Sequence, residues 1–152
     1  MSSYPHMSPR ESVIWEDFLR SRYMPKGNVY YDSRVGHAIP AEPGASAWLS
    51  AVRNVTSRKR LDVVIETRDA WWLVEVKVRA GLSAIGQVIG YTYLFGQSLS
   101  GERPILGLIV CNYAAMDIDT IAEQEGIGLY VASLGGPPRW VAPQAGLLFG
   151  FG

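Results

Sequence analysis

The sequence predicts an α/β fold in which helices flank a mixed β-sheet. Three patterns lead to this prediction: two apolar strand patterns around a short turn at residues 60–78, a helical pattern at 82–99, and a continuous apolar run at 105–111. The two strand patterns are typical of an antiparallel hairpin. The uninterrupted apolar run is typical of a parallel strand buried on both faces. A sheet that contains both kinds of pairing is mixed.

Length and composition favour one domain over residues 1–152. Hydrophobic residues make up 48% and charged residues 18% of the chain, which fits neither a disordered nor a fibrous protein. The apolar runs are far shorter than the roughly 20 residues needed to span a bilayer, and nothing near the N-terminus resembles a secretion signal. We therefore expect a cytoplasmic protein that does not span a membrane.

The first part of the chain predicts a helix followed by a strand. Ser8 is typical of a helix N-cap, and Glu11 is its capping-box partner. The helix is expected to run to about Tyr23, and the aromatic and β-branched residues of 28–35 are expected to form a strand. Two prolines and a glycine interrupt the pattern between 37 and 57, which predicts an insertion loop.

The rest of the chain alternates between strands and helices. Strands are expected at 60–66 and 70–78, then a helix at 82–99, a strand at 105–111, a helix at 117–125 and a strand at 127–132. Gly126 is expected to cap the second of these helices. From about residue 135 no regular period is present, so an irregular tail is expected. The predicted order is α-β-β-β-α-β-α-β.

Glu75 and Lys77 are charged residues within an otherwise apolar strand. Side chains alternate between the faces of a sheet, so both project from one face while Val76 projects into the core. A solvated surface stripe is the alternative interpretation, because Glu-x-Lys is common on exposed strands. Trp71 is expected on the same face as Glu75, where it either covers one end of the sheet or stacks on a base.

Asp62 precedes the apolar run of the neighbouring strand. If the hairpin turns on the two residues between Thr67 and Ala70, Asp62 lies directly opposite Glu75. Opposed Cβ atoms are about 5 Å apart, and two carboxylates at that distance destabilise a hairpin unless a positive charge lies between them. Mg²⁺ and Mn²⁺ prefer oxygen ligands. The register therefore predicts a divalent metal site, with Lys77 beside it.

This combination resembles the PD-(D/E)xK nuclease superfamily over most of the chain. Its motif corresponds to Arg60-Leu61-Asp62 and Glu75-Val76-Lys77, with leucine in place of the usual proline. The resemblance implies a restriction-endonuclease-like fold and hydrolysis of DNA phosphodiester bonds by water. It also implies that Mg²⁺ or Mn²⁺ is bound by the two carboxylates and the backbone carbonyl of Val76, while the lysine stabilises the transition state.

The segment Gln87-Val-Ile-Gly-Tyr91 resembles the Gln-x-x-x-Tyr motif of RecB-like nucleases within this superfamily. Gln87 and Tyr91 are four residues apart and so share a helix face. The resemblance implies that both reach DNA or the metal site. The alternative is that Tyr91 is a core aromatic residue and Gln87 a surface residue.

A glutamate on the first helix is a further possible metal ligand, because many members of the superfamily have one there. Glu11 borders the core-facing stripe of the expected helix, whereas Glu16 lies beyond that stripe. We therefore select Glu11. Its competing role is in the capping box, where its carboxylate would bind the backbone of Ser8.

A DNA-binding surface has to be local, because the 14 basic and 14 acidic residues give a formal charge of zero. The dense basic cluster, which leads into the strand that begins near Asp62, consists of Arg53, Arg58, Lys59 and Arg60. These side chains are candidates for binding phosphates. An ordinary solvated loop is the alternative.

Other functions fit the same pattern. The chain could be a non-catalytic nucleic-acid-binding or assembly subunit with this fold. It could also be a homodimeric Holliday-junction resolvase whose apolar tail supplies the dimer interface. Both endonuclease and exonuclease action fit this pattern.

Replacing Arg58, Lys59 and Arg60 by alanine tests the basic cluster. We expect weaker DNA binding and a shallower salt dependence, because fewer counterions are released when fewer phosphates are neutralised. Binding titrations at several salt concentrations measure both quantities. An unchanged slope would identify the cluster as an ordinary loop.

Overall fold

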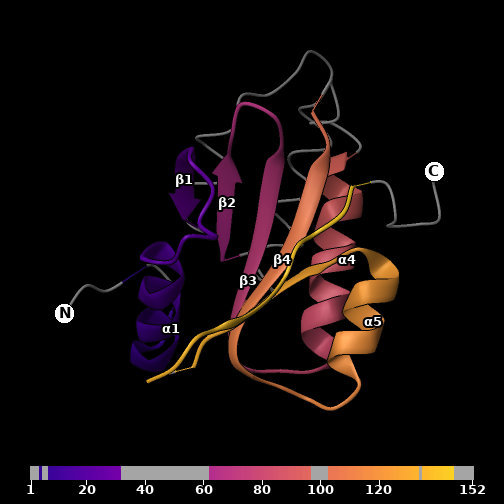
Figure 1. Ribbon diagram of the computed structural model, residues 1–152. Coiled ribbons are helices and arrows are strands. Elements are labelled where there is room, and N and C mark those ends of the chain that lie inside the picture. The colour runs from indigo at the N-terminus through magenta and orange to yellow at the C-terminus, as the bar shows by residue number, and fades with distance from the viewer. Residues whose placement is uncertain (1–3, 5–6, 32–61, 97–102, 134, 146–152) are drawn as a thin grey trace.

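The described part of the chain forms a six-stranded mixed sheet with helices on both faces (Figure 1). The computed structural model describes residues 4, 7–31, 62–96, 103–133 and 135–145. Strand order in the sheet equals strand order in the sequence. Strands β1 to β3 pair antiparallel, β3 to β5 pair parallel, and β6 returns antiparallel to β5. The predicted α/β class with a mixed sheet is confirmed.

The elements of the described residues follow the predicted sequence of helices and strands, with one strand more. The helices are α1 (Pro9–Leu19), α4 (Leu82–Gly96) and α5 (Ile118–Glu125). The strands are β1 (Asn28–Tyr31), β2 (Val63–Glu66), β3 (Trp71–Ala80), β4 (Ile105–Ala114), β5 (Gly128–Val131) and β6 (Arg139–Val141). The insertion loop expected at 37–57 lies outside the described residues.

Helix α1 begins as predicted but ends earlier than expected. The Ser8 hydroxyl accepts from the Glu11 N–H, and the Glu11 carboxylate accepts from the Ser8 N–H, which completes a capping box. The predicted end at Tyr23 is wrong, because the helix stops at Leu19. There the Ser21 hydroxyl donates to the Phe18 carbonyl and accepts from the Tyr23 N–H. These local hydrogen bonds replace the helical ones.

One face of the sheet is covered by α1. Three apolar side chains of this helix, Ile14, Trp15 and Phe18, pack on buried residues of the central strands: Val63, Ile65, Val74, Val76, Leu108, Val110 and Tyr130. The Trp15 indole N–H donates to the Tyr31 hydroxyl at 3.0 Å. Large aromatic side chains therefore anchor α1 to both the β1 and the β5 side of the sheet.

The opposite face is covered by α4 and α5, as Figure 1 shows. Buried side chains of both helices pack on the alternate residues of β4 and β5; this second cluster includes Ala84, Ile85, Val88, Ile109, Cys111, Ile118, Ala122 and Leu129. Because β3 and β4 pair in parallel register, Glu75 lies beside Ile109 and Lys77 beside Cys111. Glu75 and Lys77 therefore belong to the α4 face of the sheet.

Strand β6 corrects the expectation of an irregular tail from residue 135. It pairs with β5, with Trp140 opposite Tyr130. The Trp140 ring stacks on Tyr23, with 4.8 Å between the ring centroids. A strand of three residues is too short to show an alternating pattern. Strand β6 also contacts aromatic residues that are distant in the sequence, and a local pattern does not reveal such contacts.

Gly107 brings β4 and α4 into close approach. A Cβ atom at this position would lie 2.4 Å from a methyl carbon of Val88. In contrast, a Cβ atom at Gly90, which is exposed on α4, meets nothing within 4 Å. Only Gly107 is therefore required by the packing of this helix on the sheet.

Gly107→Ala is expected to lower the free energy of unfolding by about 1–3 kcal/mol, because the added methyl group overpacks this contact. Gly90→Ala is the matched control. It should raise the free energy of unfolding by up to ~1 kcal/mol, because alanine favours a helix interior. Urea denaturation followed by circular dichroism measures both values. Equal effects of the two substitutions would contradict the close approach.

Candidate active site

The register of the β2–β3 hairpin determines which charged side chains meet. Val63 is paired with Val74 and Glu66 with Trp71. At the turn the Thr67 N–H donates to the Ala70 carbonyl at 2.9 Å. This is the predicted register, and its continuation by one residue beyond Val63 places Asp62 opposite Glu75.

Asp62 lies directly before β2 and makes a side-chain hydrogen bond to the neighbouring strand. Its Oδ2 accepts from the buried Val76 N–H at 2.8 Å, where a longer β2 would offer a backbone carbonyl. In an antiparallel ladder the N–H and C=O of one residue point to the same neighbour. The Val76 carbonyl therefore lies on the Asp62 side of β3, while the Val76 side chain is buried against α1.

The two carboxyl groups form a buried pair. Asp62 is 8% and Glu75 1% exposed, and a hydrogen bond joins their side chains. Desolvation, followed by the charge and hydrogen bond of Asp62, raises the pKa of Glu75 to about 9. Desolvation also raises the pKa of Asp62, although its hydrogen bonds to Glu75 and Val76 oppose the shift. The pair therefore holds a proton near neutral pH.

Lys77 supplies the positive charge beside this pair. Its Nζ lies 3.6 Å from Glu75 Oε1. The lysine side chain is 34% exposed, whereas that of Glu75 is 2% exposed. The site therefore passes from a buried carboxyl pair to an ammonium group that solvent can reach.

A divalent cation fits the donor set of this pair. Glu75 Oε2 is buried and has no hydrogen-bond partner in the described structure, and a buried oxygen in that state is costly. Among the described residues no group of three or more His, Cys, Asp or Glu side chains gathers at metal-binding distance. The available donors are thus the two carboxylates and the Val76 carbonyl, which suits Mg²⁺ because this ion commonly keeps water and phosphate ligands as well.

Of the two candidate glutamates, Glu11 acts electrostatically on the carboxyl pair. The charge of Glu11 contributes to the raised pKa of Asp62. At the same time the Glu11 carboxylate accepts from the Ser8 N–H at 2.9 Å, so the predicted competition with capping is real. Glu16 instead accepts from the Tyr4 hydroxyl and lies 3.9 Å from Arg20.

Gln87 and Tyr91 lie on α4, which covers the face that carries Glu75 and Lys77. Tyr91 is buried and Gln87 is half-buried. This arrangement is compatible with both interpretations of the Gln-x-x-x-Tyr motif. The predicted phosphate-binding residues Arg53, Arg58, Lys59 and Arg60 lie outside the described residues.

The two ends of β3 differ in exposure, and only the residue at the exposed end, Arg79, was absent from the sequence-based candidates. Trp71 is buried under the guanidinium of Arg103, 4.6 Å from the ring centroid. It therefore covers one end of the sheet, and its ring is not open to a base. At the other end Arg79, two residues beyond Lys77, is exposed. Alternation along β3 was the signal that could have found Arg79.

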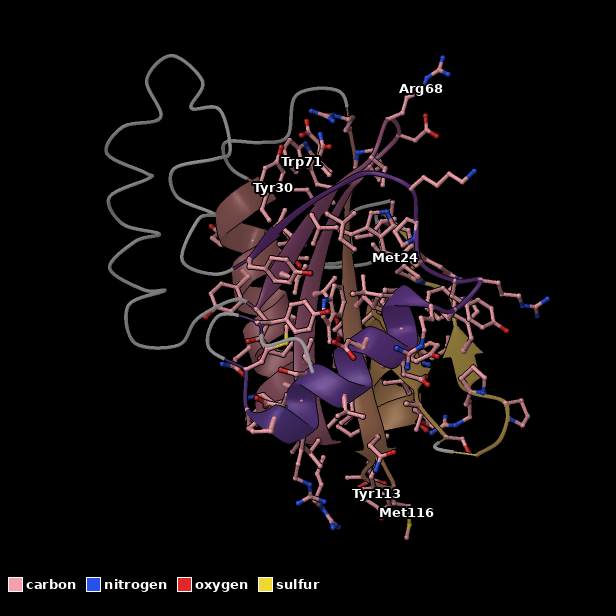
Figure 2. All side chains as sticks on the ribbon, turned by 90° about the vertical axis from the view of Figure 1, so that its left-hand side faces the viewer. Met24, Tyr30, Arg68, Trp71, Tyr113 and Met116 are labelled. Carbon is pink, nitrogen blue, oxygen red and sulfur yellow. The ribbon has the colours of Figure 1, made fainter. Side chains whose placement is uncertain are left out.

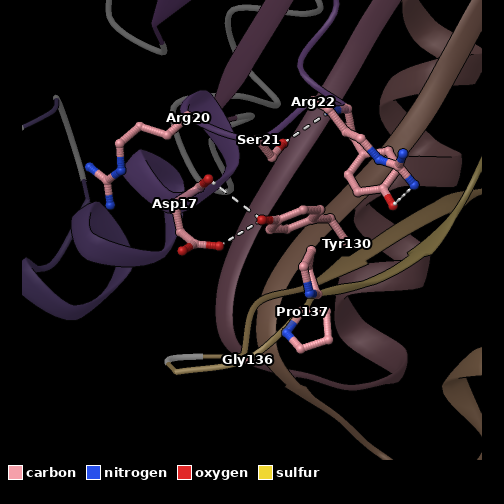
Figure 3. Close-up of a pocket in the computed structure, with 9 residues that line it drawn as sticks. Asp17, Arg20, Ser21, Arg22, Tyr130, Gly136 and Pro137 are labelled. Atoms are coloured by element: carbon pink, nitrogen blue, oxygen red, sulfur yellow. Dashed lines mark hydrogen bonds between the residues drawn. The ribbon is translucent and has the colours of Figure 1, made fainter.

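A pocket of about 410 Å³ lies away from the carboxyl pair, where the end of α1 meets β5 and residues 136–138. Figure 3 shows the Tyr130 hydroxyl pointing at Asp17 across it. This hydroxyl donates to Asp17 Oδ2 at 2.6 Å. The lining contains none of the predicted site residues, so the pocket is a feature separate from the hairpin site.

Comparison with known proteins adds no relative: no family model, curated protein or solved structure matches the chain. No helix in the described ranges has the length and apolar character required to cross a membrane. The hairpin geometry is therefore the basis for inferring a function.

The raised pKa of Glu75 predicts how stability depends on pH. A carboxyl whose folded pKa exceeds its usual value of 4.5 binds more protons in the folded state, so stability falls as the pH rises from about 4.5 to about 9. In chelator, the Tm of the protein should decrease over this range. Glu75→Gln should flatten the decrease and raise the Tm at pH 8, because the amide carries no charge.

Thermal unfolding at pH 5 to 9 tests this expectation. Glu123→Gln, at an exposed position on α5, is the matched control and should leave the slope unchanged. A wild-type Tm that rises between pH 6 and 8, with the same slope in Glu75→Gln, would show that Glu75 is ionised in the folded protein.

Proposed function

We propose that the chain is a metal-dependent nuclease that hydrolyses DNA phosphodiester bonds through a PD-(D/E)xK site of the RecB-like kind. The buried Asp62–Glu75 pair beside Lys77 is the observation that carries the proposal. Burying two carboxyl groups costs free energy that a hydrogen bond between them only partly offsets. Such a pair is expected where a ligand compensates the charge, and strongly shifted pKa values favour a functional site.

The metal would be held by Asp62, Glu75 and the backbone carbonyl of Val76. Bound there, Mg²⁺ or Mn²⁺ would polarise the phosphodiester and lower the pKa of water. Glu11 is close enough for its charge to act on Asp62 and is a further possible ligand, once its hydrogen bond to Ser8 is released. Metal binding would displace the proton that the carboxyl pair holds at neutral pH.

Lys77 would act on the reacting phosphate. Its ammonium group is partly exposed and fixed beside Glu75, so it can orient the attacking water and stabilise negative charge that grows on the phosphate oxygens. Water would lose a proton as its oxygen bonds to phosphorus, the bond from phosphorus to the leaving sugar oxygen would break, and the leaving oxygen would take up a proton in exchange. The products are a phosphomonoester and a hydroxyl group, without a covalent intermediate.

The remaining predicted residues would position DNA. Gln87 and Tyr91 are on the helix that covers the site face, and we assign them to contacts with DNA or the metal site. The basic cluster Arg53, Arg58, Lys59 and Arg60 would bind flanking phosphates. The order of elements supports a restriction-endonuclease-like fold, and we place the activity in the cytoplasm.

Lys77→Met tests the catalytic role, because methionine keeps much of the aliphatic stem and removes the charge. We expect folding and metal binding to survive and cleavage to fall roughly a hundredfold or more, as when one preorganised electrostatic group is deleted. Lys26→Met, at an exposed position after α1, is the control and should cleave at the wild-type rate.

The assay uses linear, circular and branched DNA with Mg²⁺, Mn²⁺ or chelator, so that it also separates end-dependent from internal cleavage. Wild-type cleavage in chelator would contradict a metal-dependent mechanism. Cleavage by Lys77→Met at the wild-type rate in saturating Mg²⁺ would reduce Lys77 to a surface lysine and remove the main catalytic support for the proposal.

A further inference from the structure

We propose that Arg79 and Tyr113 bind an unpaired nucleotide next to the phosphodiester that is cut, so that the preferred substrate is single-stranded at the cleavage site. This inference rests on the proposed nuclease function and specifies its substrate class. It starts from a pair of side chains at the end of β3 and β4 that the proposed chemistry does not use.

Arg79 continues the polar row of the proposed active site. Glu75, Lys77 and Arg79 occupy alternate positions of β3 and therefore share the α4 face of the sheet. Two residues of a strand advance by about 6.6 Å. Arg79 is thus one such step beyond Lys77, on the solvent side of the site. There it could meet the phosphate that is next, along the DNA strand, to the phosphate being cut.

Tyr113 is the partner of Arg79 in the parallel β3–β4 register. The Arg79 guanidinium lies over the Tyr113 ring, 4.6 Å from its centroid. The tyrosine is 50% exposed, so a large part of it remains accessible to a ligand. An arginine binds phosphate through its N–H groups, and an accessible aromatic ring can stack on a base.

A second arginine–aromatic pair in the same sheet has a buried ring and a hydrogen-bonded arginine, and it serves as a comparison for the Arg79–Tyr113 pair. At the opposite end of β3, Arg103 lies over Trp71. There the ring is buried, and Arg103 donates to the Glu66 carboxylate at 3.1 Å and to the Thr67 carbonyl at 3.0 Å. That pair closes the hairpin end of the sheet. The Arg79–Tyr113 pair is the exposed one.

The chain that follows Tyr113 is hydrogen-bonded to the end of β3 and carries an exposed apolar side chain. The Ala115 N–H donates to the Ala80 carbonyl at 3.0 Å, which ties the chain after β4 to the end of β3. Figure 2 shows Tyr113 and Met116 together at the end of the sheet opposite Arg68 and Trp71. Met116 is 91% exposed. An exposed apolar side chain is thus present at the same end of the sheet as Tyr113.

The substrate class follows from stacking. In a duplex each base is already stacked and paired with its complement, so a base has to leave the helix before it can stack on a protein ring. A single-stranded segment avoids that cost. Stacking of one base on an aromatic side chain corresponds to roughly tenfold or more in affinity.

The test compares the wild-type protein with three variants, Tyr113→Ala, Tyr113→Phe and Arg79→Ala. Arg68→Ala is the control at the opposite end of the sheet. Cleavage of a single-stranded oligonucleotide and of the blunt duplex of the same sequence is measured with Mg²⁺ or Mn²⁺. We expect the single strand to be the better substrate, and Tyr113→Ala to raise its KM about tenfold with kcat within about twofold.

The variants separate stacking from folding. Tyr113→Phe should behave as wild type because its ring is retained, and Arg68→Ala should have no effect. Arg79→Ala should raise KM and reduce the salt dependence of binding, because one phosphate contact is lost. Equal cleavage of both substrates, or a wild-type KM in Tyr113→Ala, would overturn the inference while leaving the nuclease proposal intact.

Binding measured by fluorescence anisotropy with the same oligonucleotides distinguishes the two proposals if no cleavage is detected. In that case the missing cleavage would contradict the nuclease proposal. Tenfold weaker binding of the single strand by Tyr113→Ala would still support the nucleotide site. Absence of binding as well as cleavage would overturn both. A change from monomer to dimer that depends on Tyr113 and Met116, without nucleic-acid binding, would identify this surface as a contact between copies of the chain and overturn the inference.

Discussion

The pairing of β2 with β3 is the constraint on which the proposed site depends. A two-residue turn sets the register, and Val63 and Ile65 then face α1 together with Val74 and Val76. A slip by one residue would turn these apolar side chains to the other face. The packing of α1 therefore enforces the register, and the same register brings the Asp62 carboxylate to Glu75. The β2–β3 register therefore determines both the packing of the core and the geometry of the proposed site.

The carboxyl pair is a local conflict within an otherwise consistent fold. Val64 and Leu73, which are opposed in the hairpin, are both fully buried, and Glu75 follows two residues later on the same face with almost no exposure. A strand selected only for packing would carry an apolar residue there. Such disagreements between a residue and its surroundings are expected at functional sites, which is why the sequence pattern indicated Asp62 and Glu75 as candidates.

The features that were predictable depend on short-range periodicity. Patterns that repeat within two to four residues predicted the capping box of α1 and the hairpin turn. They also predicted that Val76 and Lys77 face opposite sides of the sheet. What the sequence did not reveal depends on distant contacts. Strand β6 pairs with β5 beside Tyr23, which stacks on Trp140, and the burial of Trp71 depends on Arg103, which is 32 positions further along the chain. No local pattern encodes these contacts.

Along the α4 face of β3, burial decreases beyond Glu75, and this gradient would let the proposed site combine opposite requirements. Trp71, Leu73 and Glu75 are buried, Lys77 is partly exposed and Arg79 is exposed. In a medium of low polarity, a bound cation would interact with the two carboxylates more strongly, and this attraction would oppose the cost of burying them. The proposed substrate, in contrast, is a polyanion and would be bound by cations that solvent can reach. A chain with zero formal charge could still bind both a metal ion and a polyanion in this way. The cations of β3, Lys77 and Arg79, lie only at the exposed end of this gradient.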